Sequence, residues 1–147
     1  MTMNGRTLFA DKSFLYALVD PDDRYHEVCS TILNDAEDQI RLVVTTNFVV
    51  AECHALLLSR LGRGVALRWL MGIRGSGTLE KVTEADETAA LEILTRYDDK
   101  DFSFVDATSF GIMERLGIVT ALALDIHFVQ YGRFLVLPLE GDRLTVA

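Results

Sequence analysis

Cysteine and proline are scarce in this sequence of 147 residues, which contains two of each. Cys29 and Cys53 are far apart, without the short spacing of a zinc or redox motif, and both fall in apolar helical patterns. We interpret them as reduced core residues, with a single disulfide in a secreted protein as the alternative. No Pro/Gly/Ser-rich linker or internal repeat divides the chain, so the sequence predicts one domain over residues 1–147.

Long hydrophobic runs are also missing. No stretch of about 18 apolar residues could span a bilayer, and the polar segment Met1–Arg6 does not resemble a signal peptide. We therefore expect a cytoplasmic protein without a membrane association. Half of the residues are hydrophobic, and the mean hydropathy is +0.22. That composition suits a globular core that needs neither disulfides nor a structural metal.

Positive charge is in deficit, because 22 Asp and Glu face 14 Lys and Arg, for a net charge of −8. Taken alone, this balance argues against nucleic-acid binding. Carboxylates gathered around a divalent cation would account for part of the excess, since the cation offsets their charge. The basic residues are also unevenly placed. Residues 53–79 contain no Asp or Glu but include Arg60, Arg63, Arg68 and Arg74.

Apolar strands alternate with helical patterns along the chain. Strands are predicted at Thr7–Ala10 and Arg41–Thr45, within 75–83, and at 118–124 and 134–137. Helices are predicted from Asp11 to Pro21, from Asp22 and Asp23 onward, from Asn47 as N-cap to Leu61, and at 65–73, 84–97 and 104–117. This order predicts an α/β fold, with a mostly parallel central sheet of four or five strands and helices on both faces. Ligands of such sheets bind beyond the carboxyl ends of the strands.

Four acidic residues stand where they could share such a site. Asp11 and Asp125 each follow a predicted strand, and Asp106 lies in the first turn of a helix. Glu52 falls in an apolar helical stripe, where a carboxylate without a partner is costly. A hard divalent cation bound through oxygen atoms would explain all four together.

Each acid also has a purely structural interpretation. An Asp after a strand is a common turn residue or helix N-cap. Ser103 and Asp106 have the spacing of a capping box. Glu52 could pair with a Lys or Arg from another helix.

The chain resembles PIN domains, and VapC-like toxins among them, in four blocks. The blocks are LFADKSFLYALVDPDDRYH, TTNFVVAECHALL, YDDKDFSFVDATSFGIMERLGI and ALALDIHF, in the family's order and over nearly the whole chain. The resemblance implies a three-layer PIN-like fold and a metal-dependent endoribonuclease, the toxin of a type II toxin–antitoxin pair. Lys12 and Ala123 depart from the pattern, at positions where a small polar residue and a Thr are frequent.

The resemblance also implies a set of site residues. Asp11, Glu52, Asp106 and Asp125 would be the catalytic residues and would hold one or two Mg²⁺ or Mn²⁺ ions, for hydrolysis that leaves a 5′-phosphate. Residues expected to support or orient the site are Ser13, Thr46, Ser103 and Asp101.

The arginine-rich segment 53–79 is the candidate RNA contact, with a solvated face or a protein interface as the alternative. Its apolar residues Leu67, Trp69, Leu70 and Met71 suit a homodimer interface or an antitoxin-binding groove, as in VapC-like proteins. The expected partners are therefore an RNA substrate, a cognate antitoxin and a second copy of the chain.

Other functions are less consistent with the residues. A phosphoacceptor receiver domain needs an acidic pair after the first strand and a Lys after the fifth, and this sequence has neither. A catalytically silent PIN-fold binding module and a DNA substrate both stay open as alternatives. We interpret His26 and His54 as surface or interfacial residues and give no firm role to His127, two residues after Asp125.

Overall fold

The central sheet has five parallel strands in the order β3-β2-β1-β4-β5. The computed structural model describes residues 5–76 and 78–142. The strands are β1 (Thr7–Ala10), β2 (Leu42–Thr46), β3 (Leu79–Glu80), β4 (Thr120–Leu122) and β5 (Leu135–Leu137). In register, Phe9 of β1 lies beside Val44 on one side and Ala121 on the other.

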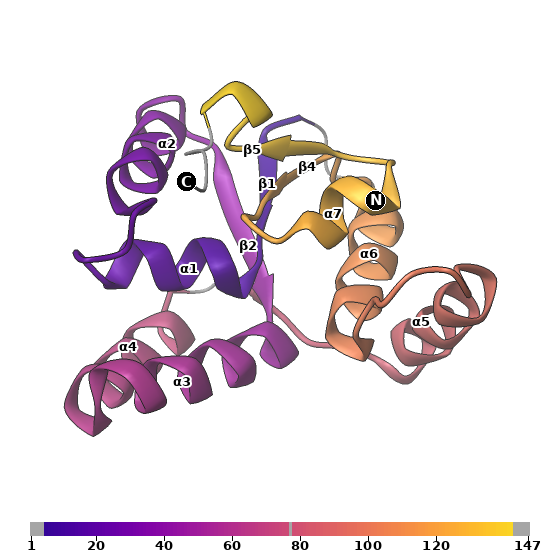
Figure 1. Cartoon of the computed structure of the whole chain (residues 1–147), viewed down its shortest axis with the longest axis horizontal. Helices are drawn as coiled ribbons and strands as arrows, with labels where there is room; N and C mark the ends of the chain where they lie inside the picture. The colour runs from indigo at the N-terminus through magenta and orange to yellow at the C-terminus, as the bar shows by residue number, and fades with distance from the viewer. Residues whose placement is uncertain (1–4, 77, 143–147) are drawn as a thin grey trace.

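Helices connect the strands and cover both faces of the sheet. They are α1 (Lys12–Val19), α2 (His26–Asp38), α3 (Asn47–Leu61), α4 (Arg63–Arg74), α5 (Glu84–Arg96), α6 (Phe104–Leu116) and α7 (Ile126–Tyr131), followed by the short 3-10 turn η1 (Glu140–Asp142). Figure 1 shows α1 and α2 on one side of the sheet and α6 and α7 on the other. Helices α3 and α4 continue the α1 side, and α5 packs outside α6, so the predicted three-layer α/β fold is confirmed.

The hydrophobic core lies between these layers and holds α7 against the sheet. Leu8, Phe9 and Ala10 are completely buried, as expected for a central parallel strand. The Phe128 ring of α7 stacks on Phe9 and meets Phe110 of α6 edge to face at 4.9 Å. Aromatic packing therefore anchors the first turns of α7 against the sheet, directly after Asp125.

The strand order creates a crevice beside β1. The chain moves outward from β1 through β2 to β3, and then returns to place β4 on the other side of β1. The helices that follow β1 and β4 consequently diverge to opposite faces of the sheet. In doubly wound folds, the carboxyl ends at such a switch point form the ligand-binding crevice. Asp11 and Asp125 occupy those two ends.

Several local predictions were wrong. Thr46, not Asn47, caps α3, and Asn47 Oδ1 instead accepts a hydrogen bond from Val82 N. The second helix begins at His26 rather than at Asp22 or Asp23, because Asp23 Oδ1 accepts from the Tyr25 amide in a turn. The helix α7 was not predicted at all.

Some predictions involve residues outside the described ranges. The domain bounds 1–147, the segment Met1–Arg6 and the range 75–83, within which a strand was predicted, each include such residues. Within the described ranges, none of the helices has the length and apolar character needed to cross a membrane. Cys29 and Cys53 are buried and are not joined by a disulfide, in agreement with their interpretation as reduced core residues.

Candidate active site

Asp11 lies at the centre of the crevice, between β1 and α1. It is the N-cap residue of α1, as the structural alternative expects, yet its side chain makes no capping hydrogen bond, so capping does not account for its carboxylate. Its backbone amide donates to Leu122 O of β4 at 3.0 Å, which ties the two strand ends together. The carboxylate instead accepts a hydrogen bond from Ser13 Oγ at 3.2 Å.

The Asp11 carboxylate is electrostatically costly in the metal-free protein. Its residue is only 1% exposed, and its pKa is raised to about 7, chiefly by this burial. The negative charges of Asp106 and Asp125 contribute to the raised pKa, whereas hydrogen bonds from the Lys12 amide and Ser13 act in the opposite direction. Asp11 therefore shares one electrostatic environment with two of the three other predicted acids.

Asp106 enters the same crevice from the first turn of α6. Ser103 Oγ accepts a hydrogen bond from Asp106 N, and Asp106 Oδ2 accepts one from Ser103 N, both at 3.0 Å. The predicted capping box is thus present, and it fixes the carboxylate rather than removing it from the site. Asp106 is 6% exposed, buried deeply enough for its charge to matter to its neighbours.

Asp125 and His127 come from the N-terminus of α7. Asp125 Oδ1 caps this helix by accepting a hydrogen bond from His127 N at 2.9 Å. The His127 ring folds back, so that Nδ1 donates to Asp106 Oδ2 at 2.8 Å and lies 3.2 Å from Asp125 Oδ1. The edge-to-face contact with Phe102 orients this ring. His127 is the residue of the site that the sequence reasoning missed.

These residues fit a divalent cation. One ligand atom from each of Asp106, Asp125 and His127 lies within 4.8 Å of the other two, and Asp11 is close enough for their charges to affect its pKa. Carboxylate oxygens are the donors that Mg²⁺ and Mn²⁺ prefer. A cation would also offset the repulsion that raises the pKa of Asp11.

Glu52 lies to one side of this group and pairs with Lys12. Its Oε1 is 3.5 Å from Lys12 Nζ, and the two side chains are 30% and 37% exposed. The sequence alternative, a partner from another helix, is therefore what the structure shows. An ion pair of this exposure contributes about 0 to 1 kcal/mol. Glu52 is thus half-buried and could exchange Lys12 for a metal ion at little cost.

The expected supporting residues differ in their positions. Ser13 links the two strand ends, because its Oγ donates to Asp11 and accepts from Leu124 N at 2.9 Å. Thr46 is fully buried and caps α3, the helix that carries Glu52. Asp101 is exposed in the loop before α6. Ser103 acts through the capping box described above.

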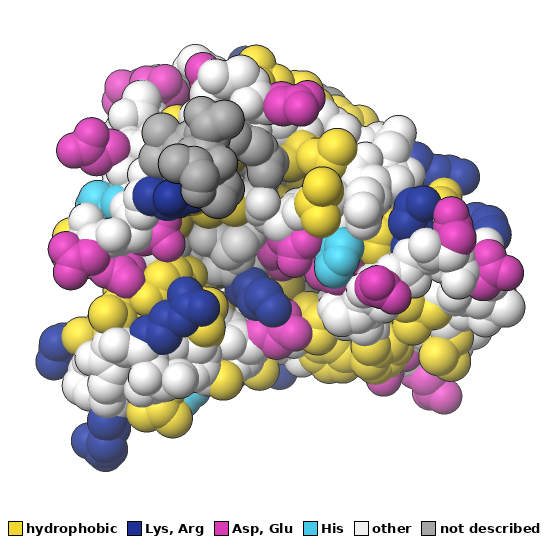
Figure 2. Space-filling view, in the orientation of Figure 1, with side chains coloured by type: hydrophobic (Ala, Val, Ile, Leu, Met, Phe, Trp, Pro, Cys, Tyr) yellow, Lys and Arg dark blue, Asp and Glu magenta, His cyan; other side chains and the backbone are white. Residues whose placement is uncertain are grey.

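The four arginines do not form one face. Arg60 of α3 stacks on Tyr16 of α1, with its guanidinium carbon 5.1 Å from the ring centre. Arg63, Arg68 and Arg74 are exposed on α4. Figure 2 shows acidic side chains and a histidine in the hollow between the two halves of the molecule, with Lys or Arg side chains nearby on one wall.

Comparison with known proteins decides the family. The PIN domain family matches residues 8–133 of this chain. The chain belongs to the PIN domain family. The 23S rRNA-specific endonuclease VapC20 of Mycobacterium tuberculosis is 36% identical over 127 residues, which cover 85% of this chain and 94% of that protein. Ribonuclease VapC26 of the same organism is 29% identical over 140 residues, which cover 95% of this chain and 98% of that protein.

Solved structures agree with this PIN assignment. The crystal structure of Mycobacterium tuberculosis VapC20, described as a sarcin–ricin loop cleaving toxin, matches with a TM-score of 0.78 at 35% identity. The match covers 86% of this chain and 95% of that chain. FitAcB from Neisseria gonorrhoeae matches with a TM-score of 0.65 at 14% identity over 88% of this chain and 95% of that one, a likeness of fold alone. The predicted resemblance to VapC-like PIN ribonucleases is confirmed.

Proposed function

We propose that this PIN domain is a Mg²⁺- or Mn²⁺-dependent endoribonuclease that acts as the toxin of a toxin–antitoxin pair. The observation that carries the proposal is the convergence of Asp11, Asp106, Asp125 and His127 at the β1–β4 switch point. Of the relatives described above, VapC20 is by name a 23S rRNA-specific endonuclease and VapC26 a ribonuclease. The cytoplasm is the proposed site of action, since RNA is available there and buried thiols stay reduced.

The residues have distinct parts in the proposed reaction. Asp11, Asp106 and Asp125 would hold one or two ions, with Glu52 joining them after release from Lys12. When bound, the metal lowers the pKa of a water molecule and stabilises charge on the scissile phosphate. His127 keeps the Asp106 carboxylate oriented by donating from Nδ1 to Oδ2. Ser13 holds Asp11 in place against the end of β4.

The test is cleavage of labelled RNA by the purified chain, with Mg²⁺ or Mn²⁺ and then with EDTA. The substrates are a mixed RNA pool, 23S rRNA and a sarcin–ricin loop oligonucleotide beside a scrambled hairpin, because of the substrate named for VapC20. We expect metal-dependent cutting that Asp11→Asn and Asp106→Asn abolish while the far-UV circular dichroism spectrum is retained. A folded wild-type protein that cuts none of these RNAs with either metal would instead favour a silent binding module.

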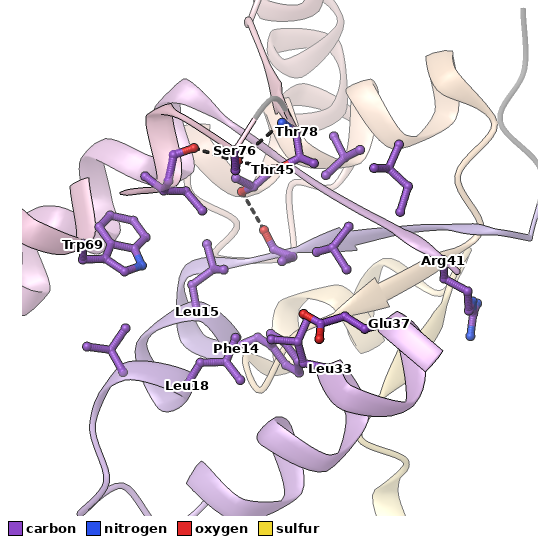
Figure 3. A pocket seen from close by; sticks show the side chains of 16 residues that line it. Phe14, Leu15, Leu18, Leu33, Glu37, Arg41, Thr45, Trp69, Ser76 and Thr78 are labelled. Carbon is purple, nitrogen blue, oxygen red and sulfur yellow. Dashed lines mark hydrogen bonds between the residues drawn. The ribbon is translucent and has the colours of Figure 1, made fainter. Parts of the chain in front are cut away.

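An antitoxin segment has a suitable groove on the α1 side of the sheet. The groove has a volume of about 470 Å³ and runs between α1, α2, β2 and α4. Figure 3 shows Phe14, Leu18, Leu33 and Trp69 lining it, with the charged residues Glu37 and Arg41 at one end. An apolar groove with a charged end suits an amphipathic helix or extended peptide.

The groove proposal is tested with Trp69→Ala, which removes the largest apolar side chain in its wall. The matched control is Leu58→Ala on α3, where the side chain is 47% exposed and lies outside the groove. We expect only the Trp69 variant to lose co-purification with an antitoxin encoded beside this gene. Equal loss in both variants would exclude the groove as the docking surface.

A homodimer is proposed through the exposed apolar residues of α4. Leu67 and Met71 are one helical turn apart and are 38% and 68% exposed, so they share a face directed away from the core. Light scattering after gel filtration measures the mass directly. A monomer at concentrations of tens of micromolar would contradict the proposal, and Leu67→Lys should dissociate a dimer formed through this face.

A further inference from the structure

A second feature of the active-site hollow is a groove between α1 and α3 that leads away from the carboxylates. It has a volume of about 490 Å³, and its lining residues are Lys12, Glu52, Ala55, Leu56, Ser59 and Arg60. One end is at Glu52, beside the proposed metal site, and the other is at Arg60, near the end of α3.

The two helices are linked at both ends of this groove. Lys12 and Tyr16 are four residues apart on α1 and share a face, as do Glu52 and Arg60, eight residues apart on α3. Lys12 Nζ lies 3.5 Å from Glu52 at one end, and the Arg60 guanidinium stacks on Tyr16 at the other. The groove therefore carries one cation on each wall, Lys12 on α1 and Arg60 on α3. The contacts at its two ends are about 6 Å apart along α1, from Lys12 to Tyr16, and about 12 Å apart along α3, from Glu52 to Arg60.

Neither cation is committed to a strong structural contact. Lys12 makes only the half-exposed pair with Glu52, which a metal ion would displace. Among the described residues, no carboxylate forms an ion pair with Arg60, although the Tyr16 hydroxyl beneath it donates to Asp20 Oδ2 at 2.6 Å. Stacking and a hydrogen bond with Tyr16 hold the exposed Arg60 side chain in place near the charge of Asp20, and a guanidinium has further N–H groups to offer a ligand. Such preorganisation lowers the entropic cost of binding an anion.

We propose that Lys12, Ser59 and Arg60 form a phosphate-binding track for the RNA strand that leaves the cleavage site. This inference rests on the proposed nuclease function and adds the direction in which the substrate runs. The groove runs from Lys12 and Glu52 to Arg60, so the track would hold backbone phosphates of the strand just outside the cleavage site. Arg60 of α3 belongs to this track, whereas Arg63 and Arg68 lie on α4 and do not.

The test measures binding of a labelled single-stranded RNA by fluorescence anisotropy, in EDTA, over a range of salt concentrations. Omitting the metal prevents turnover, and the half-exposed Lys12–Glu52 pair is weak enough for an RNA phosphate to compete for Lys12. We compare the track variant Lys12→Ala/Arg60→Ala with the α4 variant Arg63→Ala/Arg68→Ala. Both variants lose two positive charges, but those of the second lie on exposed parts of α4. Each lost phosphate contact lowers the slope of log K against log salt by about 0.7, so the track variant should lose about 1.4 while the α4 variant keeps the wild-type slope.

Charge-retaining variants guard against a folding defect. Lys12→Arg/Arg60→Lys should keep a slope within about 0.5 of wild type, because both phosphate contacts persist. A wild-type slope in Lys12→Ala/Arg60→Ala, or an equal loss of slope in both alanine variants, would overturn the track. If the wild type still cleaved RNA in a metal-dependent way, the nuclease function would stand without it. A wild-type protein that neither binds nor cuts RNA would overturn both proposals.

Discussion

Replacing Asp11 with Asn should stabilise the metal-free protein and greatly reduce the stability that it gains from metal. Asp11 is buried, and its pKa in the folded chain is raised to about 7, compared with about 3.9 in an unfolded chain. At a pH between these two pKa values, Asp11 is protonated in the folded state and has lost its proton in the unfolded state. The free energy of unfolding therefore falls as pH rises from about 4 to about 7. Three pKa units correspond to about 4 kcal/mol, which is an upper limit because partial opening of the site would relieve it.

The Asn side chain cannot ionise and escapes this cost. We expect Asp11→Asn and wild type to have similar stability in EDTA at pH 4.5, and the variant to gain up to about 4 kcal/mol over wild type by pH 8. Urea unfolding followed by circular dichroism measures the difference at each pH. Asp98→Asn, an equal charge change at an exposed position, is the matched control and should show no such pH-dependent gain.

Metal addition completes the experiment at pH 8. Wild type should gain about 2.7 kcal/mol at a metal concentration one hundred times its dissociation constant, and Asp11→Asn should gain much less. The reasoning is refuted if Asp11→Asn is no more stable than wild type in EDTA at pH 8. In that case the burial of Asp11 and its repulsion by neighbouring carboxylates would not destabilise the metal-free fold.

Three other substitutions test separate contacts. His127→Ala should weaken metal binding and cleavage by about 10- to 100-fold, since Asp106 loses its orienting donor; unchanged metal affinity by calorimetry would exclude that role. Ser103→Ala should cost about 1 kcal/mol of stability through the lost cap of α6, which urea unfolding measures. Arg115→Ala should cost about 3 kcal/mol because the buried Asp86 carboxylate loses the two hydrogen bonds that Arg115 donates, at 2.8 and 3.0 Å, and keeps the one from Thr83 N. Although burial alone would raise the pKa of Asp86, Arg115 and Thr83 lower it, so this stabilisation is complete above about pH 4 and is lost in acid; an Arg115→Ala protein with wild-type acid unfolding would contradict it.

The positions of Asp11 and Asp125 were predictable because these residues follow strand ends. A buried strand such as Thr7–Ala10 is visible in the sequence, and a parallel sheet brings its carboxyl end next to that of Thr120–Leu122. The capping box of Asp106 was equally local and equally visible. The sequence could not show that the Asp11 side chain makes no capping hydrogen bond, since its orientation depends on the contact with Ser13 and on the depth of burial.

The missed features depend on short elements or distant partners. Helix α7 has six residues, too few for a helical period to stand out, so the position of His127 relative to Asp106 was not apparent. An Asp-x-His sequence at a strand end was the available signal. Lys12 and Glu52 are forty positions apart, and their pairing requires the packing of α1 on α3. Thr46 and Asn47 are both good N-cap residues, and contact of Asn47 with distant Val82 decides between them.

The net charge of −8 is compatible with an RNA substrate because the acids and bases are segregated. Exposed acids of α2, namely Glu27, Asp35, Glu37 and Asp38, lie on a helix that does not line the α1–α3 groove. Figure 2 shows Asp and Glu side chains gathered over α2, whereas Lys and Arg side chains lie over α3 and α4. The potential near a site depends on local charges within about a Debye length, not on the net charge. An RNA strand in this groove would meet Lys12 and Arg60 first, and carboxylates neutralised by metal second.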